Sequence, residues 1–195
     1  MWNERYSIKE YYYGLEPNDF LAGHYNEIPE GRVLEIGAGE GRNSVFLAKQ
    51  GYEVTALDQS TVGLEKARKL AKDQGVEITT VEANLSEFEF DPDYWQGIIG
   101  IFCHLPVALR KRVLRNCMHG LATGGVILLE AFTPSQLKYN TGGPKDPLML
   151  YTLADLRSDL AGLNFEYGEE LEREVNEGNH HNGIAAVVQV LARKI

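Results

Sequence analysis

Short apolar runs alternate with amphipathic segments over the first two thirds of the chain. The runs rich in Val, Ile and Leu predict strands over residues 32–36, 53–57, 77–81, 95–102 and 126–131. The segments with helical spacing, capping residues or C-terminal glycines predict helices over residues 18–28, 42–50, 60–74 and 106–121. This alternation requires right-handed crossovers and a mostly parallel sheet with helices on both faces.

The last third of the chain has a different pattern. A long loop over residues 132–151 precedes a helix over 152–160, and two runs, 165–175 and 184–192, follow with no helix between them. We expect these two runs to form a terminal hairpin. The length of 195 residues fits one domain.

A glycine-rich segment follows the first predicted strand. Gly37, Gly39 and Gly41 alternate along it, a helix follows, and Asp58 ends the next apolar run. Alternating glycines allow a tight turn and a close approach of the backbone to a ligand, and the helix presents free N–H groups there. The order of strand, glycine turn, helix and distant acid predicts a nucleotide site at the carboxyl ends of the strands.

Two features decide which nucleotide is expected. The dinucleotide fingerprint is Gly-x-Gly-x-x-Gly, whereas this chain has one residue fewer before its third glycine. Glu35 also lies two residues before the first glycine, where a carboxylate would repel a pyrophosphate and attract a cation. S-adenosylmethionine carries an ammonium and a sulfonium but no phosphate, and its ribose offers two hydroxyls to Asp58.

The residues of this motif resemble those of the class I S-adenosylmethionine-dependent methyltransferases. The segments 11–21 and 39–44 are similar to small bacterial methyltransferases related to the tellurite-resistance enzymes. The resemblance implies an α/β, Rossmann-like fold: a seven-stranded, mostly parallel sheet with helices on both faces and an antiparallel last strand. It further implies a single methyltransferase domain over 1–195, with an N-terminal helical lid segment (1–30), a cofactor-binding core (31–131) and a substrate loop, helix and hairpin (132–195).

The resemblance and the positions at strand ends together predict the binding site of S-adenosylmethionine, with S-adenosylhomocysteine as product. Asn84 and Leu85 lie where the family usually contacts adenine, although Asn84 also fits an ordinary turn. Arg42 and Asn43 would anchor the methionine end or the substrate, or be plain helix surface. The predicted cofactor-binding residues are Tyr13, Glu35, Gly37, Ala38, Gly39, Arg42, Asn43, Asp58, Gln59, Asn84, Leu85 and Phe102.

The chemistry asks for alignment and exclusion of water, and for a base only if the acceptor must lose a proton. His104, directly after the fourth strand, is the first candidate base, with loop hydrogen bonding as the alternative. Tyr139 lies on the long loop where the family builds its acceptor pocket, and His181, beside His180, lies in the turn of the hairpin. We expect His104, Tyr139 and His181 to be catalytic, and no metal to be needed.

The amino-acid composition limits the kinds of partner that this protein is expected to bind. The formal net charge of −9 and the absence of a basic stripe disfavour nucleic acid, and no apolar stretch is long enough for a membrane span. Two cysteines imply no disulfide framework and suit the cytoplasm. We expect a small-molecule or small oxyanion acceptor. The resemblance suggests tellurite or selenite, but the family pairs arginine with histidine in its hairpin, and no arginine lies between Arg173 and Arg193.

Two other functions fit part of the pattern. A nicotinamide-dependent oxidoreductase would also use the glycine turn and Asp58, and a noncatalytic S-adenosylmethionine-binding module would use the whole site without turnover. Glu35 and the missing glycine count against the oxidoreductase. The sequence leaves open the identity of the acceptor and the oligomeric state.

Overall fold

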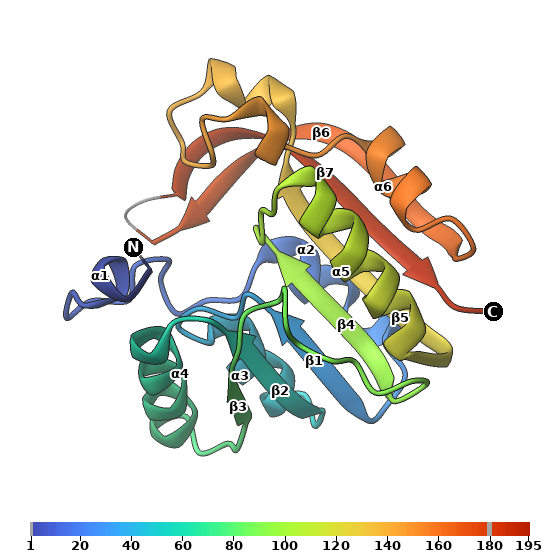
Figure 1. Ribbon diagram of the computed structural model, residues 1–195. Helices are drawn as coiled ribbons and strands as arrows, with labels where there is room; N and C mark the ends of the chain where they lie inside the picture. Colours follow the sequence, from blue (N-terminus) through green and yellow to red (C-terminus); the bar gives the residue numbers. More distant parts are fainter. Residues whose placement is uncertain (1, 179–180) are drawn as a thin grey trace.

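One mixed sheet organises the computed structural model, which describes residues 2–178 and 181–195 (Figure 1). Its seven strands lie in the order β3-β2-β1-β4-β5-β7-β6. The strands are β1 (Arg32–Ile36), β2 (Glu53–Asp58), β3 (Thr79–Glu82), β4 (Trp95–Ile101), β5 (Leu121–Phe132), β6 (Asn164–Glu177) and β7 (His181–Arg193). Strands β1 to β5 pair in parallel, and β7 pairs antiparallel with both β5 and β6. The predicted seven-stranded sheet with an antiparallel last strand is confirmed.

The helices connect these strands or precede them. They are α1 (Trp2–Tyr6), α2 (Asp19–His24), α3 (Arg42–Lys49), α4 (Thr61–Asp73), α5 (Val107–Gly120) and α6 (Leu153–Asp159), with short 3₁₀ turns at Tyr25–Glu27, Pro134–Lys138 and Pro147–Met149. Asn18 caps α2 and Ser60 caps α4, each accepting a bond from a backbone N–H of the first turn. No helix in the described part of the chain has the length and apolar character needed to cross a membrane.

The core lies on both faces of the sheet. Leu34 and Ile98 pack on the face that α5 and α6 cover, whereas their neighbours Val33 and Ile99 pack on the other face with residues of α2 and α3 (Figure 1). Successive residues of a strand point to opposite faces, so a sheet covered on both sides needs continuous apolar runs. Four of the five short apolar runs therefore become the central, doubly covered strands β1, β2, β4 and β5, whereas the run at 77–81 becomes β3 at the edge of the sheet, with no fully buried residue.

The strand order reverses between β1 and β4. From β1 the chain continues outward through β2 and β3, and then returns to add β4 and β5 on the other side. Ligands of open parallel sheets bind beyond the carboxyl ends of the strands at such a point. Figure 1 shows α1 on one side of this edge, and the β6–β7 hairpin and the segment after β5 on another.

Candidate active site

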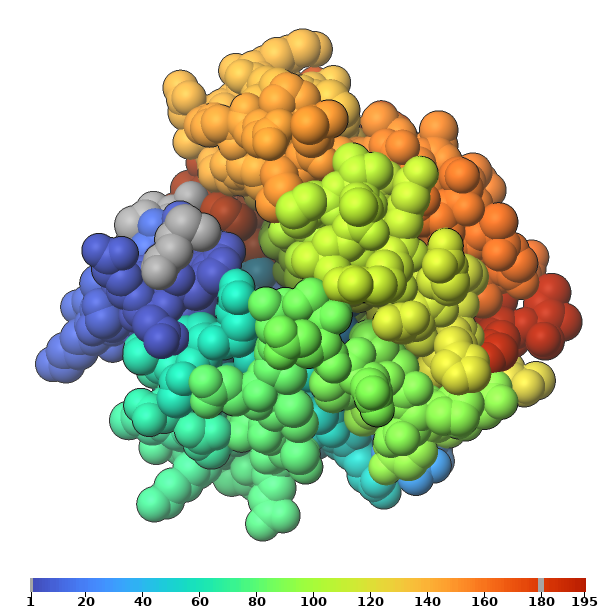
Figure 2. All heavy atoms as spheres, viewed as in Figure 1, coloured from blue at the N-terminus to red at the C-terminus, as the bar shows by residue number. Residues whose placement is uncertain are grey.

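A cavity of about 640 Å³ lies at the carboxyl ends of the central strands. Figure 2 shows the surface hollowed between the N-terminal segment, in blue, and the green and orange segments that face it. Every residue predicted to bind the cofactor lines this cavity, and so do His104 and His181, whereas Tyr139 does not. The structure therefore brings together residues that lie far apart in the sequence.

The glycine turn forms the floor of the cavity next to β1. Gly37, Gly39 and Gly41 all have positive φ, of 70°, 54° and 81°. A Cβ on Gly37 would lie 2.9 Å from the Cys103 sulfur, and one on Gly39 would lie 2.7 Å from the Tyr6 hydroxyl. The turn thus requires glycine both for its backbone angles and for the space around it.

Glu35 is buried at the end of β1 and borders the cavity. Its carboxylate accepts hydrogen bonds from Asn43 Nδ2, at 3.0 Å, and from the Ser44 hydroxyl. Burial raises the pKa of Glu35, although these two hydrogen bonds and the charge of Arg42 oppose the shift. A buried acid of this kind gains most from a cation that enters the cavity, because the cation stabilises its charged form.

Asp58 ends β2 and shapes the glycine turn. One carboxylate oxygen accepts from the Gly39 N–H and the other from the Ser60 N–H, both at 2.8 Å. Burial raises the pKa of Asp58, and these backbone hydrogen bonds oppose the shift. The Gln59 backbone also donates to this carboxylate. A carboxylate can accept about four hydrogen bonds in all, so one position remains for a ligand hydroxyl.

The next strand ends supply further lining residues. Asn84 follows β3, and its Oδ1 accepts the Ser86 N–H at 2.9 Å, so it stabilises the local turn as well as lining the cavity. Gln59 and Leu85 also line the cavity, after β2 and β3. Phe102, after β4, has a φ of 51°, a strained value for a residue with a side chain.

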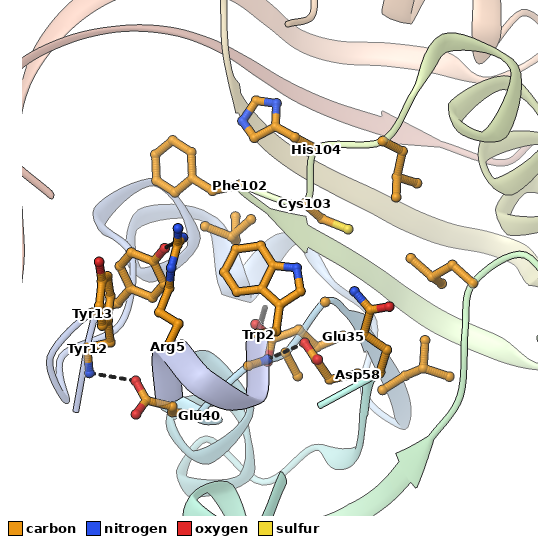
Figure 3. Close-up of a pocket in the computed structure, with 18 of the residues that line it drawn as sticks. Trp2, Arg5, Tyr12, Tyr13, Glu35, Glu40, Asp58, Phe102, Cys103 and His104 are labelled. Atoms are coloured by element: carbon orange, nitrogen blue, oxygen red, sulfur yellow. Dashed lines mark hydrogen bonds between the residues drawn. The ribbon is translucent and has the colours of Figure 1, made fainter. Parts of the chain in front are cut away.

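The N-terminal segment borders the cavity opposite β4 (Figure 3). Arg5 donates to the Tyr13 hydroxyl at 3.1 Å and lies over the Trp2 ring, 4.6 Å from its centroid. The Tyr12 N–H donates to Glu40 Oε2 at 2.7 Å. Of the residues in this segment, only Tyr13 was predicted from the sequence to bind the cofactor. The aromatic residues of α1, Trp2 and Tyr6, which stack four positions apart, were the available signal.

The other end of the cavity is aromatic. Phe102 and Phe132 stack with ring centroids 4.5 Å apart, and His104 lies nearly parallel to Phe132 at 5.5 Å. The His181 ring lies 4.5 Å from the Tyr13 ring and is nearly perpendicular to both phenylalanine rings. We call these five rings, from four separate parts of the chain, the aromatic wall.

His104 has both ring nitrogens bound to the backbone. Its Nδ1 lies 2.7 Å from the Met149 carbonyl oxygen, and its Nε2 accepts the Phe132 N–H at 3.2 Å. Burial lowers the pKa of His104 to about 4, so the ring is neutral near pH 7. A neutral imidazole with its N–H and its lone pair both engaged holds two loops together and keeps no free lone pair for an acceptor.

His181 lies in a different environment, at the start of β7. Its Nδ1 lies 3.6 Å from Glu177 Oε2, and that carboxylate oxygen also accepts from Arg42 Nη2 at 2.6 Å. Asn18 donates to the other oxygen of Glu177 at 2.8 Å. Burial alone would raise the pKa of Glu177, but His181, Arg42 and Asn18 together lower it to about 2.

Glu177 was missed in the sequence because it falls among several acids of β6. Its inward position follows from the alternation of buried and exposed residues near the end of that strand.

His180 lies outside the described residues. Tyr139 lies outside the cavity lining, and a hydrogen bond to Glu172 raises its pKa. Within residues 2–178 and 181–195, no group of three His, Cys, Asp or Glu side chains could hold a metal ion.

Comparison with known sequences shows similarity to methyltransferases. Residues 33–125 match a family described as "Methyltransferase domain". The ubiquinone biosynthesis O-methyltransferase of Rickettsia felis is 34% identical over 74 residues, which are 38% of this chain and 30% of that protein. The chain matches less than half the length of this relative and of the other curated relatives found beside it.

Solved structures share the whole fold. An S-adenosylmethionine-dependent methyltransferase from Methanosarcina mazei has a TM-score of 0.72 at 19% identity, covering 93% of this chain and 99% of that one. TehB from Haemophilus influenzae has a TM-score of 0.71 at 20% identity, covering 91% of this chain and 62% of that one. This chain is therefore similar to methyltransferases in sequence over residues 33–125, and it shares the fold of S-adenosylmethionine-dependent methyltransferases over most of its length.

Proposed function

We propose that this protein transfers a methyl group from S-adenosylmethionine to a small-molecule acceptor by in-line displacement. The observation that carries the proposal is the cavity in which a buried acid, the glycine turn and a second acid meet at adjacent strand ends. S-adenosylmethionine supplies a methyl group that its sulfonium already activates. The protein then has to align donor and acceptor and keep water out, which accounts for much of the acceleration in such reactions.

Different residues of the cavity would contact different parts of S-adenosylmethionine. Glu35, with Arg42 and Asn43 beside it, would face the methionine end, where the ammonium offsets the charge of Glu35. The turn at residues 37–39 would let the backbone approach the ligand closely, and Asp58 would accept hydrogen bonds from the ribose hydroxyls.

The remaining residues enclose the base and the methyl group. Gln59, Asn84 and Leu85 would contact the adenine, since they follow β2 and β3 on the same edge. Phe102 and Tyr13 would border the methyl group, Tyr13 from the N-terminal segment as part of a lid. Of the residues expected to be catalytic, His181 keeps that role in our proposal. His104 positions the loops, and Tyr139 would reach an acceptor only at the rim.

The partner that we propose is a small molecule rather than a nucleic acid. A chain with a net charge of −9 is poorly suited to a phosphate backbone, and the cavity is enclosed by loops on several sides. Oxyanions such as tellurite and selenite remain within the proposed acceptor range. Cytoplasmic location is part of the proposal, supported by two free cysteines and no disulfide in the described structure.

Calorimetric titration with S-adenosylhomocysteine and with NAD tests the proposal. We expect saturable binding of S-adenosylhomocysteine and no heat of binding with NAD. Tight NAD binding without a response to S-adenosylhomocysteine would instead indicate a nicotinamide-dependent oxidoreductase. A noncatalytic binding module would bind S-adenosylhomocysteine yet methylate nothing in a broad panel of thiols, phenols, amines, tellurite and selenite.

A further inference from the structure

We propose that the acceptor is a planar phenol held against the aromatic wall, and that His181, aligned by Glu177, accepts the proton of its hydroxyl. This inference rests on the proposed methyl transfer and adds to it the class of acceptor and the proton acceptor. It uses three observations: the rings of the wall, the free nitrogen of His181, and the carboxylate behind it.

The wall favours a flat, uncharged molecule. Phe102 and Phe132 stack at 4.5 Å, and the His181 ring stands edge-on to both, at 81° and 77°. Aromatic faces and edges of this kind stabilise another ring by offset stacking or edge-to-face contacts. A phenol ring fits such a surface, whereas a small oxyanion gains little from it.

The cations that line the cavity are already engaged. The Arg42 guanidinium pairs with Glu177 at 2.6 Å. The Arg5 guanidinium lies over the rings of Trp2 and Tyr12, at 4.6 and 5.3 Å from their centroids. An oxyanion would have to compete with these contacts, because anion sites depend on charged donors in a fixed geometry.

His181 has the ring nitrogen that a base needs. Its buried Nδ1 faces Glu177 at 3.6 Å, a long contact that can shorten when a substrate is in place. A proton on Nδ1 leaves the lone pair on Nε2, and no described residue donates a hydrogen bond to Nε2. The ring borders the cavity, so this lone pair is available to a ligand.

The proton transfer balances charge as well as atoms. The hydroxyl O–H bond breaks and its proton moves to His181 Nε2, while the oxygen bonds the methyl carbon and the carbon–sulfur bond breaks with its electron pair remaining on sulfur. Positive charge therefore passes from the sulfonium to the imidazolium. The carboxylate of Glu177 stabilises that imidazolium and fixes its orientation, as the carboxylate does in other carboxylate–histidine pairs.

The strength of the base limits which acceptor hydroxyls it can deprotonate. A phenol has a pKa near 10, like the tyrosine side chain, within reach of an imidazole assisted by a carboxylate. An aliphatic hydroxyl is far less acidic and would need a stronger base. An aromatic thiol is already ionised at pH 8 and would need none, which gives a matched substrate for the test.

The experiment compares a phenol panel with the corresponding aromatic thiols at pH 8, using S-adenosylmethionine with an isotopically labelled methyl group. We expect His181→Asn to lower kcat for the phenol by about 100-fold or more, the usual contribution of a general base. The thiol rate should change less than about threefold, since its nucleophile is already charged. Glu177→Gln should lower the phenol rate selectively, and Glu174→Gln, an exposed acid of the same strand, should change neither rate.

Several outcomes would overturn the inference. An equal loss for phenol and thiol in His181→Asn would mean that His181 only supports the fold. Methylation of tellurite or selenite but of no phenol would mean that the cavity takes oxyanions. Binding of S-adenosylhomocysteine without methylation of any phenol would also contradict it. A failure to bind S-adenosylhomocysteine would refute the proposed function instead. Glu177 also pairs with Arg42, so the affinity for S-adenosylhomocysteine is measured for each variant. If Glu177→Gln loses this affinity, the phenol and thiol rates of His181→Asn alone decide whether His181 is the base.

Discussion

Glu35 and Asp58 each bind groups of the protein itself as well as facing the cavity. Their positions could be predicted, because an acid near a glycine turn and an acid at the next strand end are local features of the sequence. Their hydrogen bonds could not, since Ser44 and Ser60 are not marked by the motif. Both acids therefore contribute to the shape of the glycine turn before any ligand is bound.

Gly39→Ala should destabilise the protein and loosen α1. The φ of 54° disfavours any side chain, and the new Cβ would lie 2.7 Å from the Tyr6 hydroxyl. Gly75→Ala is the matched control, because its φ is 70° but nothing lies within 4 Å of the added Cβ. Thermal unfolding should show a cost of about 1–2 kcal/mol for the control and roughly 1–3 kcal/mol more for Gly39→Ala.

The extra cost of Gly39→Ala should fall when the hydroxyl is removed. In the background Tyr6→Phe, the Cβ would meet only the ring carbons, the nearest at 3.2 Å. Equal costs for Gly39→Ala and Gly75→Ala would show that α1 does not pack on the turn as described.

Asp58→Ala should weaken the binding of S-adenosylhomocysteine by about 1–3 kcal/mol, through lost hydrogen bonds to the ribose and a less ordered turn. Isothermal titration measures the affinity directly. An unchanged dissociation constant in a folded variant would remove Asp58 from the ribose site.

The different roles of His104 and His181 could not be predicted from the sequence around each histidine. His104 and His181 were both candidates by position. Which one is free depends on Met149 and Phe132, which bind His104, and on Glu177, which faces His181. These partners come from separate elements, so no local pattern could distinguish the two roles.

Among the elements, the terminal hairpin extends further than the sequence indicated. Strands β6 and β7 span Asn164–Glu177 and His181–Arg193, beyond the predicted 165–175 and 184–192. Many charged residues of β6 face solvent and dilute its apolar pattern, while Glu177 at its end is buried against Asn18 and Arg42. The hairpin end therefore contacts the N-terminal segment and the helix after the glycine turn.

Glu177 should make the stability of the protein sensitive to acid. Its folded-state pKa of about 2 lies below its usual value of 4.5, so its charge stabilises the fold above about pH 4.5. This contribution is lost as the pH falls toward 2. The shift corresponds to a contribution on the order of 3 kcal/mol.

Urea unfolding of the wild type and of Glu177→Gln from pH 7 to pH 2 tests this contribution. The stability difference between them should be largest near neutral pH and shrink between about pH 5 and pH 2. The exposed Glu174→Gln variant is the control and should follow the wild type. A difference between wild type and Glu177→Gln that does not vary with pH would show that Glu177 is not the charged partner described.

At the scale of the whole molecule, the sheet could be predicted because each strand and helix carries its own pattern, and right-handed crossovers leave few ways to join them. The enclosure of the cavity could not. It depends on α1, the segment after β5 and the hairpin end meeting around the same strand ends (Figure 1). Contacts between distant segments leave no period in the sequence.

Ligand binding should stabilise the whole chain. At about 100 times its dissociation constant, S-adenosylhomocysteine should add about 2.7 kcal/mol to the free energy of unfolding. For a protein of this size, that corresponds to a rise in Tm of roughly 5–10 °C. Differential scanning fluorimetry measures the rise, with NAD as the control ligand. A rise with NAD and none with S-adenosylhomocysteine would reverse the assignment of the cavity.

The most direct test of methyl transfer is to incubate the purified protein with a small-molecule extract and S-adenosylmethionine carrying a deuterated methyl group, and to detect labelled products by mass spectrometry. We expect at least one extract component to gain the labelled methyl, with stoichiometric formation of S-adenosylhomocysteine and with less labelling by the Asp58→Ala variant at low donor concentration. A protein that binds the donor but labels no component of the extract would contradict the assignment as a methyltransferase.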